Sequence, residues 1–162
     1  AKLLGSMAPT EVGTMYAGLA QQIAAGTLHA PVEATYGLDQ LDKALELSQG
    51  ALTGKEKVLG REHLDTAKTR ENLAIVYRKQ GKHAEALEQY MQVLAVKEKV
   101  LGREHPVAAD TLYNIALVHR EQGRHDLEAE CFDKCVAIYE KVHGDTHSET
   151  VDAREQAARA RA

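Results

Sequence analysis

Two cysteines and two histidines form the clearest candidate for chemistry in the sequence. Cys131 and Cys135 lie four residues apart, and His143 and His147 follow at the same interval, in the order that zinc fingers use. A structural zinc ion needs all its ligand atoms within about 2.0–2.3 Å. Cys135 and His143, however, fall on one predicted helix, about 12 Å apart along its axis. One ion cannot reach both, so we expect no metal ligands in this chain.

No other motif in the sequence is typical of catalysis or of cofactor binding. The glycine-containing stretches lack the Lys-Ser or Lys-Thr ending of a phosphate-binding loop, and no Gly-x-Ser-x-Gly nucleophile turn is present. The 24 acidic residues are spread over predicted helix surfaces, where carboxylates mainly keep a protein soluble. We therefore expect no catalytic residues, no cofactor and no enzymatic activity.

The histidines follow a sequence repeat of 42 residues. The nine residues KEKVLGREH occur at 55–63 and again at 97–105, and the related YEKVHGDTH occupies 139–147. A fixed period of this length is typical of a solenoid, in which one structural unit is stacked repeatedly. One histidine position is therefore present in three copies, which favours an architectural role: His63, His105 and His147.

The sequence pattern within each repeat predicts two helices joined by a tight turn. Residues 64–80 carry apolar or small residues at helical spacing, and Gly81 follows them as a helix stop. Residues 82–101 carry an apolar stripe and end at Gly102 in the same way. Pro106 then suits the first turn of the next helix. Short connections make the neighbouring helices antiparallel.

The first part of the chain follows the period less closely. Here we expect one helix at about 10–25, a break at 26–31 and a long second helix ending at Leu59. The stretch Gly5-Ser6-Met7 is typical of an expression-vector remnant, so we place residues 1–7 outside the domain. The predicted single domain, 8–162, contains a divergent first repeat, two regular repeats and a half repeat or capping helix: 8–60, 61–102, 103–144 and 145–162.

Composition narrows the class of protein. The chain has 162 residues, of which 44% are hydrophobic and 27% charged, as in a globular protein. A net charge of −4 disfavours electrostatic binding of nucleic acid, and no apolar run is long enough to span a membrane. The first residues lack a secretory layout. We therefore expect a cytoplasmic protein with two reduced cysteines, acting on neither nucleic acid nor membrane.

The repeat resembles the tetratricopeptide repeats of the 42-residue type found in kinesin light chains. The resemblance is carried by the pattern N-L-A-x-x-Y-x-x-Q-G-K-x-x-x-A-L-x-x-Y at 72–90 and by the LGREHP loop at 101–106, and it covers 55–162. It implies an all-α, right-handed solenoid of antiparallel helix pairs, with about seven helices. It also implies that the first helix of each repeat lines a concave peptide-binding groove, and that the protein associates with the cytoskeleton.

The resemblance implies which side chains face that groove. Asn72 and Asn114 stand out, because asparagine is a poor helix-interior residue and its amide can pair with the backbone of an extended peptide. Nearby basic residues would favour acidic side chains in the partner. The predicted peptide-binding residues come from two successive first helices: Lys68, Asn72, Ile75, Arg78, Lys79, Tyr113, Asn114, Leu117 and Arg120.

The sequence thus predicts a non-enzymatic protein–protein interaction module that binds an extended peptide or partner segment. The alternative is a structural scaffold that assembles with itself, so that another copy fills the groove of a homo-oligomer. The identity of the partner does not follow from the sequence, because the matched positions are mostly those that pack helices together.

One position departs from the repeat at the turn between two helices. Glu128 stands where the preceding copy has Ala86, and His119 stands where it has Tyr77. A buried carboxylate without a partner costs free energy, so we expect Glu128 to form a hydrogen bond with His119 across the turn. The alternative is a small rotation of the second helix that would expose Glu128 to solvent.

Overall fold

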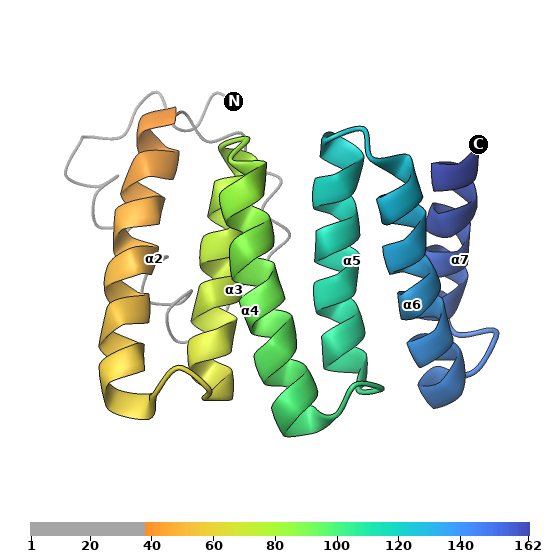
Figure 1. Cartoon of the computed structure of the whole chain (residues 1–162), viewed down its shortest axis with the longest axis horizontal. Coiled ribbons are helices and arrows are strands. Elements are labelled where there is room, and N and C mark those ends of the chain that lie inside the picture. The colour runs from red at the N-terminus through yellow and green to blue at the C-terminus, as the bar shows by residue number, and fades with distance from the viewer. Residues whose placement is uncertain (1–37) are drawn as a thin grey trace, which may run out of the picture.

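A computed structural model describes residues 38–162, and this part of the chain is built from helices alone (Figure 1). The expected helix at 10–25 and the break at 26–31 lie outside the described residues, so the expected seven helices become six in the described part. The six helices are α2 Leu38–Leu59, α3 Leu64–Lys79, α4 His83–Leu101, α5 Pro106–Glu121, α6 His125–His143 and α7 Ser148–Arg161.

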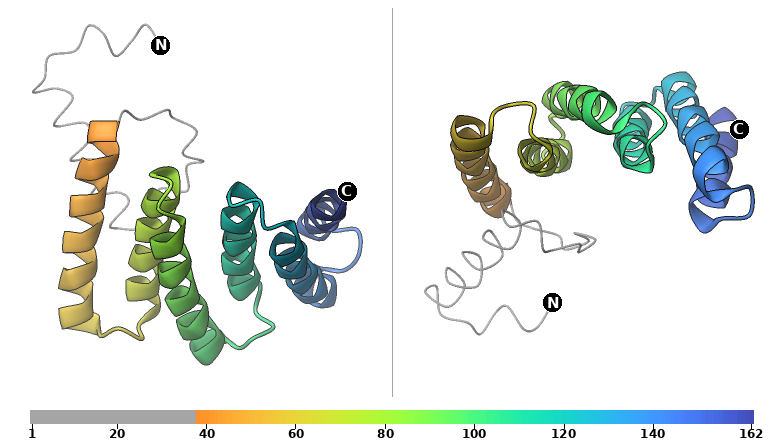
Figure 2. Two further views of the ribbon diagram at one scale, coloured as in Figure 1. Left: turned by 45° about the horizontal axis from the view of Figure 1, so that its top comes forward. Right: turned by 90° about the horizontal axis from the view of Figure 1, so that it is seen from below.

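Each helix packs against the helices that precede and follow it in the sequence. Seen along the helices, α3 and α5 lie in one row and α4 and α6 in another (Figure 2). This arrangement confirms the predicted all-α solenoid of antiparallel helix pairs. None of the described helices combines the length and the apolar character that a membrane crossing needs.

The repeated histidine caps the helix that follows each loop between pairs. Its Nδ1 accepts the backbone N–H two residues later, at 3.1 Å for His63, 3.2 Å for His105 and 3.4 Å for His147. Such a bond satisfies one of the unpaired N–H groups at a helix start. The glycine before each loop has a positive φ of 87–100°, which side chains disfavour. These positions therefore serve the architecture, as the period predicts.

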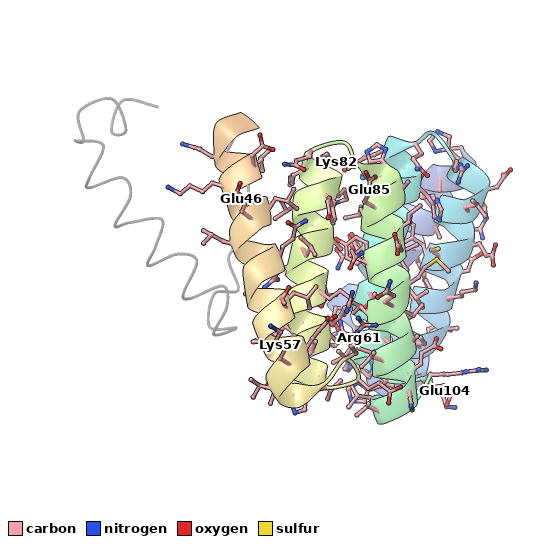
Figure 3. The ribbon with its side chains drawn as sticks, turned by 60° about the vertical axis from the view of Figure 1, so that its left-hand side comes forward. Glu46, Lys57, Arg61, Lys82, Glu85 and Glu104 are labelled. Atoms are coloured by element: carbon pink, nitrogen blue, oxygen red, sulfur yellow. The ribbon has the colours of Figure 1, made fainter. Side chains whose placement is uncertain are left out.

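An ion pair ties each of the first two loops to the end of the second helix of the same repeat. Lys99 of α4 lies 2.7 Å from Glu62 in the preceding loop, and Lys141 of α6 forms the same pair with Glu104. Figure 3 shows Glu104 and Lys57 toward one end of the molecule, opposite the end that carries Lys82. These charges are largely exposed, so each pair contributes at most about 1 kcal/mol to stability.

The core is formed by small and aliphatic residues on facing helices and by buried aromatic residues of α4 and α6. Tyr90 and Phe132 occupy the same position of the repeat, and both are fully buried. Ala86 lies beside Tyr90 and is also fully buried, which allows close helix contact. Phe132 meets the ring of Tyr113 edge-on, with centroids 5.0 Å apart.

A buried lysine links three helices. Lys97 of α4 has a side chain that is 7% exposed, and its Nζ lies 2.8 and 3.0 Å from the two carboxylate oxygens of Glu71 on α3. The same Nζ donates to Oγ1 of Thr111 on α5 at 2.8 Å. A buried ammonium group needs such partners, because it has lost its hydration. Glu71 is therefore committed to the packing of α3, α4 and α5.

The expected hydrogen bond between Glu128 and His119 is wrong. Glu128 is buried, and its oxygens lie 2.5 Å from Nε of Arg120 and 3.0 Å from Nδ1 of His125. The alternative rotation is also wrong, since Glu128 is only 1% exposed. A guanidinium group is a stronger partner for a buried carboxylate than a neutral imidazole, and burial lowers the pKa of His119.

This pairing predicts the result of two double-mutant cycles measured by urea unfolding. Removing Arg120 and Glu128 singly and together should give a coupling energy of about 0.5–3 kcal/mol, because the two residues are in contact. The matching cycle on His119 and Glu128 should be additive within about 0.5 kcal/mol. Coupling in the second cycle and additivity in the first would contradict the pairing seen here.

Candidate functional site

A pocket of about 300 Å³ opens among the last three helices. Helix α5 supplies half of its lining, and α6 and α7 supply the rest. The lining consists of three carboxylates, two phenols and one amide: Asp110, Glu149, Asp152, Tyr113, Tyr139 and Asn114.

Two hydrogen bonds hold the rim of the pocket in place. The hydroxyl of Tyr113 donates to Asp152 of α7 at 2.9 Å, and the hydroxyl of Tyr139 donates to Asp110 of α5 at 2.8 Å. Burial and the neighbouring carboxylate raise the pKa of Tyr113 to about 12, and the same causes raise the pKa of Tyr139. Both phenols therefore remain protonated donors at neutral pH, and they orient the carboxylates.

The pocket is acidic. Its three carboxylates are accompanied by no lysine, arginine or histidine among the lining residues of the described chain. A cationic group placed here could form charge-assisted hydrogen bonds, which are shorter and stronger than neutral ones. The amide of Asn114 adds a donor and an acceptor at the same place. This combination suits a basic side chain with an adjacent stretch of peptide backbone.

The structure divides the predicted binding residues into two groups. Tyr113 and Asn114 line the pocket together. Arg78 lies 2.8 Å from Glu121, and Arg120 contacts Glu128 and Gln156, so neither guanidinium forms an open basic edge. The remaining predicted residues lie outside the pocket. Lys68 and Lys79 are exposed, and Asn72 is half-buried. Ile75 and Leu117 pack against the core.

The predicted binding set omits four residues of the pocket: Asp110, Tyr139, Glu149 and Asp152. Asp152 lies one period after Asp110, so the period alone could have indicated it. Tyr139 takes the place of Lys97, where a phenol rather than an ammonium now meets the next helix. Glu149 stands in the first turn of α7, where the two earlier copies give no consistent carboxylate.

The two cysteines belong to the core rather than to a site. Cys131 and Cys135 are both buried, and burial raises the pKa of both thiols. The thiol of Cys135 donates to the backbone oxygen of Ala109 at 3.2 Å. The predicted helix through Cys135 and His143 is confirmed as α6, so the four-residue zinc arrangement cannot close on one ion.

Comparison with known proteins identifies the repeat. The family profile described as tetratricopeptide repeat matches residues 32–99, 76–141 and 108–162. No curated protein matches the chain. Among solved structures, the TPR-like repeats of a Podospora anserina protein assigned as a kinesin light chain give a TM-score of 0.69 at 24% identity, covering 94% of this chain and 66% of that chain.

Two further solved structures are similar to this chain in fold. A variant of the same Podospora anserina repeats with one residue replaced gives a TM-score of 0.69 at 24% identity, covering 95% of this chain and 67% of that chain. BtubC (BKLC) from P. vanneervenii gives a TM-score of 0.63 at 17% identity, covering 76% of this chain and 57% of that chain. The chain thus spans about two thirds or less of these proteins, and at such identities the likeness establishes the fold alone. With the family profile matched over most of its length, the chain belongs to the tetratricopeptide repeat family.

Proposed function

We propose that this chain is a non-enzymatic module that binds an extended segment of a partner protein along the first helices of its repeats. Tetratricopeptide repeats in general act as protein-interaction modules. The observation that carries the proposal for this chain is the pocket between α5 and α7, where oriented carboxylates, phenols and an amide meet in the open. Such a set of groups recognises polar peptide features rather than an apolar ligand.

The charge of the pocket supports a basic side chain in the partner, which reverses the acidic preference expected from sequence. That expectation depended on Arg78, Lys79 and Arg120. The two arginines are balanced by Glu121 and Glu128, and Lys79 is exposed outside the pocket. A lysine or arginine side chain entering the pocket would instead meet the carboxylates of Asp110, Glu149 and Asp152. Because the pocket is open to solvent, its attraction for a cation should weaken as salt increases.

The amide of Asn114 would set the register of the bound segment. It lies beside Tyr113 on α5, and an amide can bond both an N–H and a C=O of an extended chain. Main-chain bonds of this kind do not depend on peptide sequence, so selectivity would come from the basic side chain in the pocket. The apolar face of the Tyr113 ring would cover the aliphatic part of that side chain.

The proposal predicts the outcome of a selection from a display library of random peptides of about ten residues. Enriched peptides should contain lysine or arginine. Asp110→Asn with Asp152→Asn should weaken their binding about 10–100-fold, the loss expected when hydrogen bonds to charged groups of about 1.5–3 kcal/mol are removed. Fluorescence anisotropy of labelled peptides measures the affinity.

A matched control removes one exposed carboxylate elsewhere. Glu46→Gln on α2 alters the net charge without touching the pocket, so it should leave peptide affinity unchanged. Enrichment of peptides without basic residues, or equal binding by the pocket variant, would contradict the proposal. Light scattering at two concentrations tests the competing function, since a molar mass that rises with concentration and falls on addition of peptide would place a second copy in the groove.

A further inference from the structure

Two imidazoles and a carboxylate converge where α6 ends and α7 begins. Nε2 of His143 lies 3.5 Å from Oε2 of Glu149, and Nδ1 of His147 lies 3.6 Å from the same oxygen. The two imidazole rings are stacked, with centroids 4.6 Å apart and planes at 24°. One ligand atom from each residue lies within 4.8 Å of the other two.

The repeat shows that His143 is not required by the architecture. Its position at the end of the second helix is leucine in both earlier copies, Leu59 and Leu101. The loop and the following helix form equally well with that leucine, as α3 and α5 demonstrate. The imidazole at 143 is therefore a departure from the repeat that the loop and the next helix do not require, although its ring lies 6.2 Å from that of Tyr139.

Only the last copy of the repeat has all three residues of the cluster. His147 is the cap that all three copies share, but Glu149 is Asp65 in one copy and Val107 in the other. Neither earlier loop has two imidazoles, so neither offers the same three groups. Within the described chain, these three residues form the cluster whose ligand atoms approach closely enough for a metal ion.

Although the sequence predicted no metal ligands, we propose that His143, His147 and Glu149 bind a divalent transition-metal ion of the zinc class, with water completing the coordination. Ligand atoms at 2.0–2.1 Å from a tetrahedral zinc ion lie about 3.3 Å from each other. The two nitrogen–oxygen separations of 3.5 and 3.6 Å therefore need to close by a few tenths of an ångström. The two imidazole nitrogens lie within 4.8 Å of each other, and the stacked rings have to turn so that both lone pairs point at the ion. Imidazole ligands favour zinc, nickel, cobalt or copper over magnesium and calcium.

Coordination changes the role of His147. Its Nδ1 accepts the N–H of Glu149 at 3.4 Å, the longest of the three histidine caps in the described chain. That bond is the weakest of the three and the easiest to exchange for an ion. The ligand side chains are 30–51% exposed, so an ion can enter from solvent without any movement of the helices.

The site joins α6 to α7 and touches the pocket. His143 is the last residue of α6, and Glu149 belongs to α7, so a bound ion fastens the loop between them. Glu149 also lines the pocket, and an ion held there reduces the negative charge that a basic peptide meets. This second consequence depends on the proposed function, whereas binding of the ion does not.

The test is calorimetric titration of the full chain, freed of any affinity tag and stripped with chelator, with zinc chloride and nickel chloride. We expect one ion per chain. His143→Leu, which restores the residue of the other copies, should weaken binding at least tenfold and leave the fold unchanged. His105→Asn removes a histidine from a copy that lacks the other ligands and keeps a good capping residue, so it should bind as the natural sequence does.

Cobalt provides a second measurement that distinguishes the ligands. Its absorption in the bound state should show nitrogen and oxygen ligands and no thiolate charge-transfer band, because both cysteines are buried. Absence of binding, equal affinity in His143→Leu, or a thiolate band would each overturn the proposal. Failure of the peptide experiment would leave this result untouched, since the titration uses the metal alone.

Discussion

Replacing Glu71 by alanine is expected to lower the free energy of unfolding by about 3–5 kcal/mol, because it leaves a buried ammonium group without its counter-ion. Lys97 has a side chain that is 7% exposed and lies within 3.0 Å of both oxygens of Glu71. Thr111 would remain as a neutral partner, which cannot balance the charge. Urea unfolding followed by circular dichroism measures the loss.

An exposed ion pair in the same protein supplies the control. Glu62 and Lys99 lie 2.7 Å apart, but their side chains are 68% and 63% exposed. Glu62→Ala should therefore cost at most about 1 kcal/mol, because water replaces the lost partner. A loss for Glu71→Ala no larger than that for Glu62→Ala would show that water reaches Lys97.

A double replacement separates the charge from the packing. Replacing Glu71 and Lys97 together by leucine removes both buried charges and keeps much of their volume. Such exchanges are often neutral or stabilising, since neither charge then needs to be desolvated. Recovery of most of the stability lost in Glu71→Ala would assign that loss to the unpaired ammonium group.

The period predicted most of the fold because it repeats the signals that begin and end helices. The observed start of α3 at Leu64 and the end of α4 at Leu101 agree with the predicted helices. His63 and its later copies act as caps, which agrees with an architectural role for a repeated residue. These features are local, so their determinants lie within a few residues of one another in the sequence.

Pairing between helices was harder to predict. Glu71 is 26 residues from Lys97 in the sequence, and its identity as a buried partner depends on how α3 and α4 approach each other. The partner of Glu128 was mistaken for a similar reason, because Arg120 and His119 are adjacent and helix rotation decides which one turns inward. A periodic pattern fixes the face of a helix but not the reach of long side chains.

The pocket was predicted in part. Tyr113 and Asn114 follow from the family resemblance, and both line the pocket. Arg78, Lys79 and Arg120 were expected to give a basic edge, yet each arginine meets a carboxylate that the net charge alone does not reveal. The local sign of charge therefore depended on contacts between α5 and its neighbours.

Phe132→Ala is expected to lower the free energy of unfolding by about 3–5 kcal/mol, the usual loss for a fully buried aromatic ring. Phe132 has no exposed surface, and its ring contacts Tyr113 edge-on. The guanidinium group of Arg120 lies 5.5 Å from the ring centroid. Truncation therefore leaves a cavity and also removes an aromatic contact and a cation–π contact.

The effect of Phe132→Ala should be greatest at the end of the solenoid. Repeats contact their neighbours alone, so α6 and α7 can lose structure while α3 and α4 remain folded. A broader urea transition than that of the natural sequence would report this loss. Met91→Ala, which truncates a side chain that is 65% exposed on α4, should change stability by no more than about 0.5 kcal/mol. Equal losses in the two variants would mean that Phe132 is not a core residue, and the packing of α5 against α6 described here would be incorrect.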